Sequence, residues 1–155
     1  MKNVFIVFLF SFWCLFSFSQ TVCGIEEMKA MVEKTSAVSK QQDDLNDAKY
    51  KKAMSELSKV KKWDANEQAD YNWKLINNKE VIACEENKKD YIQNFTIVFH
   101  QIDQNNETEN NCKVIRQIEE TYYRVMEQNQ MEWKIILAMI SSDYKTATKK
   151  DLILE

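Results

Sequence analysis

The sequence predicts an all-α protein, a small helical bundle of four to five helices. Glycine occurs once and proline is absent from the sequence, and these are the residues on which tight β-turns rely, whereas a helical bundle can do without them. Apolar residues recur at intervals of three and four, which is the spacing of one helix face. A chain of 155 residues is long enough for one such domain with a modest core. We therefore expect a single helical domain over residues 20–155.

The first 19 residues have the pattern of a cleavable secretion signal. Lys2 supplies a positive charge, the run Val4–Phe18 is apolar apart from two serines, and Ser17-Phe18-Ser19 forms a small-x-small cleavage site before Gln20. The run is shorter than the roughly 20 residues that a spanning helix needs. We therefore expect cleavage, no transmembrane anchor afterwards, and a periplasmic or secreted protein.

The charge of the chain argues against nucleic acid as a partner. The sequence has 21 basic and 24 acidic residues, and loss of the signal removes one lysine and no acid, so the formal charge changes from −3 to −4. Basic residues are scattered among the acids, whereas nucleic-acid binding requires a basic patch or stripe.

The first half of the exported chain predicts three helices. The first covers about 24–41 and the second about 45–63, with a polar break at 41–44 (QQDD) where Asp43 or Asp44 can cap the second helix. Asp64 followed by Glu67 resembles a capping box for the third helix, which ends at 77–78. The apolar residues that we expect this third helix to bury are Ala65, Ala69, Trp73 and Ile76.

The second half predicts a hairpin of two long helices. The first runs over about 80–103, the loop 103–111 (DQNNETENN) is polar and acidic, and the second helix follows from about 112 to a break at 141–143 (SSD). Beyond the break we expect a short helix or a frayed tail. Four aromatic residues at helical spacing favour a core, or alternatively a ligand cavity: Tyr91, Phe95, Tyr122 and Trp133.

No catalytic or metal-binding constellation is visible in the sequence. His100 is the single histidine, so a Ser–His or Cys–His pair would depend on that residue alone, and we interpret it as structural or solvated. Adjacent glutamates such as Glu85-Glu86 point about 100° apart on a helix, so one such pair cannot flank a single bond. We expect no enzyme activity, no metal and no cofactor.

Three cysteines remain after the signal, namely Cys23, Cys84 and Cys112. In an oxidising compartment we expect two of them to pair and the third to be free or to bond another molecule. In a simple hairpin about the loop 103–111, Cys84 would lie about 27 Å from Cys112, at 1.5 Å per residue, whereas a disulfide needs Cα atoms within about 7 Å. Connectivity cannot be derived from the sequence; this geometry mildly favours Cys23 with Cys84.

One stretch resembles a known family. Asp44-Leu45-Asn46 followed by Tyr50, and then Gln68 with Trp73 ahead of Cys84, are similar to the motifs of the N-terminal domain of LprI-type lysozyme inhibitors. The likeness covers about residues 23–126, with Cys23 and Cys112 at the positions of the family's opening and closing cysteines. The chain has Thr35-Ser36 where the family usually has a further cysteine, which would leave one thiol unpaired.

The resemblance implies a secreted helical interaction module that binds or inhibits lysozyme or another cell-wall hydrolase. An inhibitor of this kind would present a polar loop to the enzyme, and the candidate is the loop 103–111 with Asp103, Glu107 and Glu109, whose charge suits a basic lysozyme. An alternative is a periplasmic carrier that holds a small apolar ligand in a pocket lined by Tyr91, Phe95 and Trp133. A purely structural helical protein is the remaining alternative.

Overall fold

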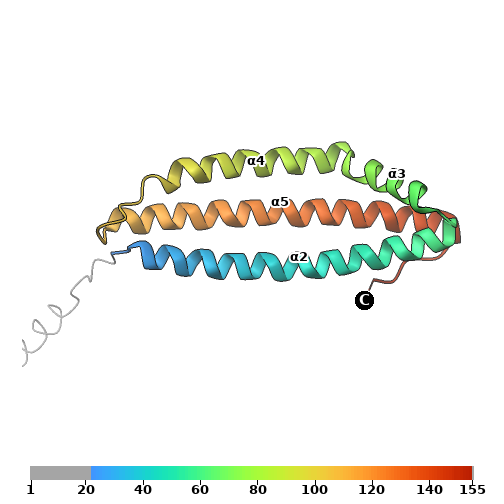
Figure 1. The fold of residues 1–155 in the computed structure, drawn as a ribbon, viewed down its shortest axis with the longest axis horizontal. Coiled ribbons are helices and arrows are strands. Elements are labelled where there is room, and N and C mark those ends of the chain that lie inside the picture. The colour runs from blue at the N-terminus through green and yellow to red at the C-terminus, as the bar shows by residue number, and fades with distance from the viewer. Residues whose placement is uncertain (1–21, 155) are drawn as a thin grey trace, which may run out of the picture.

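The computed structural model describes residues 22–154, and the expected signal sequence lies outside these residues. The described chain forms an elongated helical bundle (Figure 1), which confirms the all-α prediction. Its helices are α2 (Ile25–Lys61), α3 (Ala65–Ile76), α4 (Lys79–Phe99) and α5 (Glu109–Thr148).

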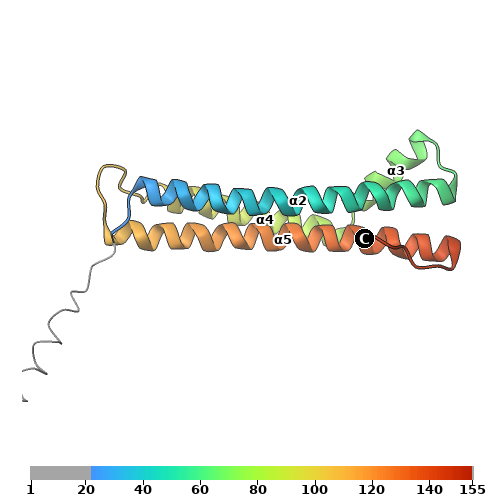
Figure 2. The ribbon, with the colours of Figure 1, turned by 90° about the horizontal axis from the view of Figure 1, so that it is seen from below.

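Helix α5 lies at the centre of the bundle and packs against both α4 and α2 (Figure 1). The chain runs along the bundle in α2, returns through α3 and α4, and runs forward again in α5, so that α2 and α5 are parallel and α4 is antiparallel to both (Figures 1 and 2). This up-down-up path places the starts of α2 and α5 at the same end of the molecule.

The predicted break at 41–44 is wrong, because α2 continues through it as one helix of 37 residues. In a helix interior, a Gln or Asp residue is less favourable than alanine by less than about 1 kcal/mol. Two of these residues also gain partners on α5: the Gln130 amide donates to the Gln42 side-chain oxygen at 2.6 Å, and the Asn129 amide donates to the Asp43 carboxylate. Neither Asp43 nor Asp44 caps a helix.

Helix α3 begins as predicted and buries the opposite face from the predicted one. The Asp64 carboxylate accepts from the Asn66 and Glu67 amides, and the Glu67 carboxylate accepts from the Asp64 amide, which completes the capping box. Tyr71 and Leu75 are buried. The stripe expected to face inward is exposed instead: Ala65, Ala69, Trp73 and Ile76.

The hairpin of α4 and α5 is confirmed, whereas the break at 141–143 is wrong. Helix α5 extends over 40 residues and passes through these positions without interruption. Ile140 just before them is fully buried, and the Tyr71 hydroxyl donates to the Asp143 carboxylate at 2.6 Å. Packing and this bond from α3 hold the segment helical, although serine and aspartate are weak helix formers.

The core consists of two apolar clusters, one at each end of the bundle. The cluster near the start of α5 contains Met28, Met31, Ile102, Val114, Ile115 and Ile118. The cluster near α3 contains Ala53, Met54, Leu57, Tyr71, Leu75, Val81, Ile136 and Ile140. Between them, α2 and α5 are joined by polar contacts, among them Ser36 with Tyr122 at 3.0 Å and the bonds of Gln42 and Asp43.

Candidate functional site

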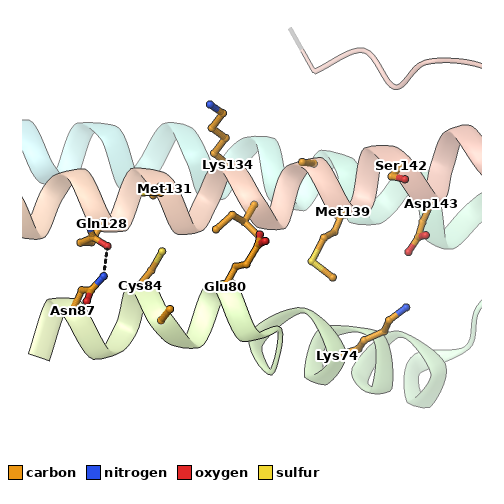
Figure 3. Close-up of a pocket in the computed structure, with 13 residues that line it drawn as sticks. Lys74, Glu80, Cys84, Asn87, Gln128, Met131, Lys134, Met139, Ser142 and Asp143 are labelled. Carbon is orange, nitrogen blue, oxygen red and sulfur yellow. Dashed lines mark hydrogen bonds between the residues drawn. The ribbon is translucent and has the colours of Figure 1, made fainter.

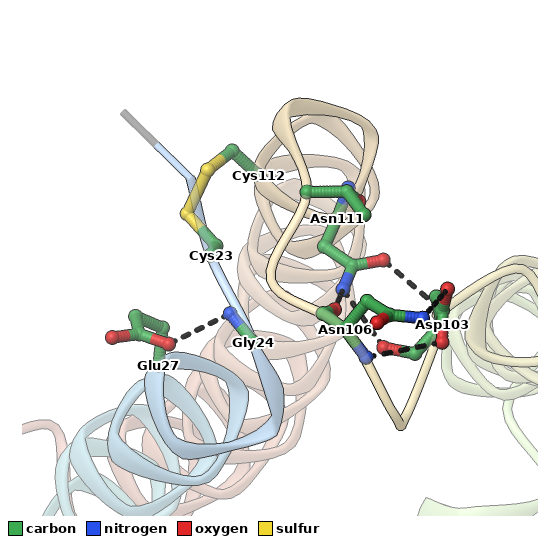
Figure 4. Close-up of a disulfide and its surroundings, with 8 residues drawn as sticks. Cys23, Gly24, Glu27, Asp103, Asn106, Asn111 and Cys112 are labelled. Carbon is green, nitrogen blue, oxygen red and sulfur yellow. Dashed lines mark hydrogen bonds between the residues drawn. A yellow bond between two sulfur atoms is a disulfide. The ribbon is translucent and has the colours of Figure 1, made fainter. Parts of the chain in front are cut away.

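A disulfide between Cys23 and Cys112 closes one end of the bundle (Figure 4). Their Cα atoms lie 5.0 Å apart across 89 residues of sequence. The Cys23 amide donates to the Thr108 carbonyl at 3.1 Å and the Thr108 amide donates to the Cys23 carbonyl at 3.0 Å. The segment before α2 is therefore tied to the first turn of α5 by one covalent bond and to the N-cap residue Thr108 by two hydrogen bonds. We call this region, residues 22–27 and 100–112, the clasped end.

The predicted pairing of Cys23 with Cys84 is wrong, and Cys84 is a buried free thiol. Cys84 lies 15 residues before the end of α4 at Phe99, which is about 22 Å along that helix, whereas Cys23 and Cys112 both lie at the clasped end. The correct pair follows from the parallel course of α2 and α5. The prediction missed it because the assumed break at 41–44 hid the single pass that α2 makes along the whole bundle.

Asn111 organises the loop at the clasped end (Figure 4). Its side chain is fully buried. The side-chain oxygen accepts from the Asp103 amide, and the side-chain nitrogen donates to the carbonyls of Asp103 and Asn106, all at 2.9 Å. The loop thus has a defined shape, because one buried side chain satisfies three of its backbone groups.

The loop acids that we expected to face a partner have three different roles. Asp103 turns back into its own loop, where its carboxylate accepts from the Asn105 and Asn106 amides and from the Asn106 side chain; these bonds lower its pKa. Glu109 forms an ion pair with Lys113 at 3.3 Å. Glu107 is exposed and has its methylene chain close to Gly24, where a Cβ would approach Glu107 Cγ to 3.1 Å.

A shallow cleft of about 200 Å3 lies between the start of α2 and this loop. Its lining includes the acids Glu26, Glu27 and Glu107. Glu27 accepts from the Gly24 amide at 2.8 Å, which lowers the pKa of its carboxyl, and Glu26 pairs with Lys29 at 2.7 Å. The cleft thus presents three acidic side chains beside the N-terminus of α2.

A larger groove of about 860 Å3 runs between α4 and α5, with Lys74 of α3 at one end (Figure 3). At the other end, the Asn87 amide donates to the Gln128 side-chain oxygen at 3.1 Å and bridges the two helices. The apolar lining consists of Ala83, Met131, Ile135, Ala138 and Met139, together with the Cys84 thiol. Tyr91, Phe95 and Trp133, which we expected to line a pocket, are not among its lining residues.

Beside Cys84, Lys88 joins α4 to α5. Its ammonium forms ion pairs with Glu132 of α5 and with Glu85 at 2.6 Å. Burial lowers the pKa of Lys88, but the two carboxylates outweigh burial and leave that pKa raised. Burial raises the pKa of Glu132. Burial also raises the pKa of the Cys84 thiol, and the Glu132 charge adds to that effect. This cluster connects two helices, and its charges act on the pKa of the Cys84 thiol in opposite directions: Glu132 and Glu85 raise it, whereas Lys88 lowers it.

The residues of the family motif are spread over the α3 end of the bundle. Asp44 and Leu45 are exposed on α2, and Leu45 and Asn46 line a shallow depression of about 380 Å3. The Tyr50 hydroxyl donates to the Asn72 side chain at 2.7 Å, and Tyr50 and Gln68 line a second depression of about 320 Å3. Trp73 is 66% exposed on the outer face of α3. The motif residues thus lie apart on α2 and α3 and do not form one concave site.

Residues 22–154 contain no cluster of three or more His, Cys, Asp or Glu side chains that could hold a metal ion. None of the four described helices has the length and apolar character needed to cross a membrane. His100 is exposed at the C-terminal cap of α4, with its ring 6.2 Å from that of Phe99.

No protein-family model matches the chain, and neither a curated protein nor a solved structure matches it.

Proposed function

We propose that this chain is an exported helical interaction protein whose clasped end binds a basic partner protein. The observation that carries this proposal is the acidic cleft of Glu26, Glu27 and Glu107 beside a loop that Asn111 holds in one shape. A preformed surface of one charge attracts an opposite charge without a large ordering cost on binding. The disulfide supports export, because such bonds persist in oxidising compartments.

The partner class that we propose is a cell-wall hydrolase, of which a basic lysozyme is the example. This choice rests on the resemblance of residues 23–126 to LprI-type lysozyme inhibitors. It agrees in sign with the acidic cleft, whose three carboxylates would meet a cationic enzyme surface. Of the three loop acids proposed from sequence, Glu107 is the one that lines this cleft.

The test is a lysozyme inhibition assay with the purified protein in micromolar excess. We expect inhibition that weakens as salt rises, because exposed charges are screened over about 10 Å at 0.1 M salt. Glu26→Gln combined with Glu107→Gln should weaken it, whereas Glu86→Gln, an exposed glutamate of α4, should not. Absence of inhibition and of binding at this excess would refute the hydrolase proposal.

A second candidate function is carriage of a small apolar molecule, and the groove between α4 and α5 favours it. Its volume of about 860 Å3 falls within the range of about 300–1,000 Å3 that is typical of ligand sites. Ala138 is exposed and lines the groove, so Ala138→Trp should fill the space without disturbing the core. Loss of apolar ligand binding in this variant, with unchanged thermal stability, would support the carrier function.

A further inference from the structure

Some of the charged side chains along the groove between α4 and α5 have partners within the described chain, and others have none. Lys74, Glu80, Lys134 and Asp143 are its charged lining residues. Lys134 extends away from α4 in Figure 3, whereas Lys74 reaches towards Asp143 at one end of the groove. Glu80 lies at the start of α4, apart from Lys74 and Asp143.

Lys74 and Asp143 are already engaged by the same tyrosine. The Lys74 ammonium lies 5.7 Å from the centre of the Tyr71 ring, a cation–π contact. The Asp143 carboxylate accepts from the Tyr71 hydroxyl at 2.6 Å. The end of the groove nearest α3 therefore carries one positive charge, Lys74, and one negative charge, Asp143, and both contact Tyr71.

Glu80 and Lys134 are the two charged lining residues that this arrangement leaves without a side-chain partner in the described chain, and Lys134 extends away from α4 (Figure 3). Figure 3 shows the Glu80 side chain reaching from α4 towards α5, beside Met139. Among residues 22–154, the Glu80 carboxylate forms no ion pair and no side-chain hydrogen bond; the Glu80 backbone amide donates to the Asn78 side chain at 2.8 Å. The Glu80 charge also helps to raise the pKa of the buried Cys84 thiol. The Glu80 carboxylate thus lies without a paired cation beside the apolar residues that line the groove.

We propose that this groove binds an amphiphilic amine, with the apolar body along Met131, Ile135 and Met139 and the ammonium at Glu80. The apolar lining would bury a hydrocarbon chain, and the ammonium would supply the cation that Glu80 lacks. A carboxylate head group of the same length would meet Glu80 with like charge. Lys74 cannot compensate easily, because moving to such a head group would cost it the contact with Tyr71.

The proposal rests on the carrier function suggested above and specifies its ligand. The probes are n-octylamine, n-octanol and octanoate, which share one alkyl length and differ in the charge of the head group. Binding is measured by titration calorimetry at neutral pH, with the protein that begins at Gln20 and contains every described residue. We expect n-octylamine to bind most tightly and octanoate most weakly.

Two variants separate the contributions of charge and apolar lining. Glu80→Gln should weaken n-octylamine binding about fivefold, the size of effect typical of a partly exposed ion pair, and should leave n-octanol binding unchanged. Glu86→Gln, on the same helix and outside the lining, should change neither. Ala138→Trp should abolish binding of all three probes.

The outcomes distinguish this proposal from the carrier function. Equal affinity for the three probes, or n-octylamine binding that Glu80→Gln does not weaken, would overturn the amine preference and leave the carrier function standing. Saturable binding of none of the probes would overturn both. Neither result bears on hydrolase inhibition, which depends on residues at the clasped end.

Discussion

Cys23 and Cys112 lie at the starts of the parallel helices α2 and α5, at the same end of the bundle, with Cα atoms 5.0 Å apart. The remaining thiol of residues 22–154, Cys84, is buried and has a raised pKa because burial disfavours its thiolate. We expect the native protein to react with iodoacetamide at one thiol, slowly, and the unfolded protein to react rapidly. Peptide mapping by mass spectrometry should recover the Cys23–Cys112 pair; a labelled Cys23 or Cys112 would contradict the structure.

Asn111→Ala should destabilise the protein by about 1–3 kcal/mol, because it leaves backbone groups of the loop unsatisfied. The matched control is Asn110→Ala, which alters an exposed asparagine next to it and should change the free energy of unfolding by less than about 0.5 kcal/mol. Urea unfolding followed by circular dichroism measures both. Equal effects of the two substitutions would show that the buried contacts of Asn111 do not stabilise the loop.

Leu75→Ala and Trp73→Ala test which face of α3 is buried. Leu75 is 1% exposed and Trp73 is 66% exposed. Removing the leucine side chain from the core should cost about 2–5 kcal/mol, whereas the exposed tryptophan should contribute within about 0.5 kcal/mol. A larger loss for Trp73→Ala, measured by thermal or urea unfolding, would restore the orientation predicted from the sequence.

Lys88 and Glu132 form an ion pair between α4 and α5, with side chains 13% and 17% exposed. Lys88→Ala leaves the Glu132 charge partly buried without its cation, and we expect a loss of about 2 kcal/mol, less than for a fully buried pair. The double variant Lys88→Met with Glu132→Leu should recover most of this loss, because well-packed apolar residues often replace such pairs without penalty. A double variant as unstable as Lys88→Ala would show that the charges themselves are needed.

Asp103 should make the clasped end sensitive to acid. Its folded pKa is held below the ordinary value of 3.8 by bonds that favour the carboxylate, first from the Asn106 side chain and then from the Asn105 amide. The stabilisation is therefore fully present above about pH 4 and disappears as the pH falls through the lowered pKa. Asp103→Asn should lower the melting temperature at pH 7, and the difference from the original protein should shrink below pH 4.

The fold class, the capping box of α3 and the α4–α5 hairpin could be predicted from the sequence, because each depends on local patterns. The face of α3 could not, since a 12-residue helix carries two stripes of suitable spacing. Ala65, Ala69, Trp73 and Ile76 form one stripe, and Tyr71 with Leu75 forms the other. The choice between them depends on contacts with α5, among them the bond from Tyr71 to Asp143.

The groove between α4 and α5 could not be predicted from the sequence for a related reason. Helix α5 carries one apolar stripe with the buried Ile136 and Ile140 and a second with Met131, Ile135 and Met139. The second stripe has helical spacing and could have indicated another face. It shares α5 with the stronger stripe, and its small partners Ala83 and Ala138 leave the space open rather than fill it.

The separation of the core into two clusters has a consequence for how the molecule opens. The covalent bond at Cys23 and Cys112 constrains the cluster around Met28 and Ile118. The cluster around Leu57 and Leu75 is held by noncovalent contacts alone within the described chain. Partial unfolding should therefore begin at the α3 end, and backbone amides there should exchange with deuterium sooner than those near the disulfide.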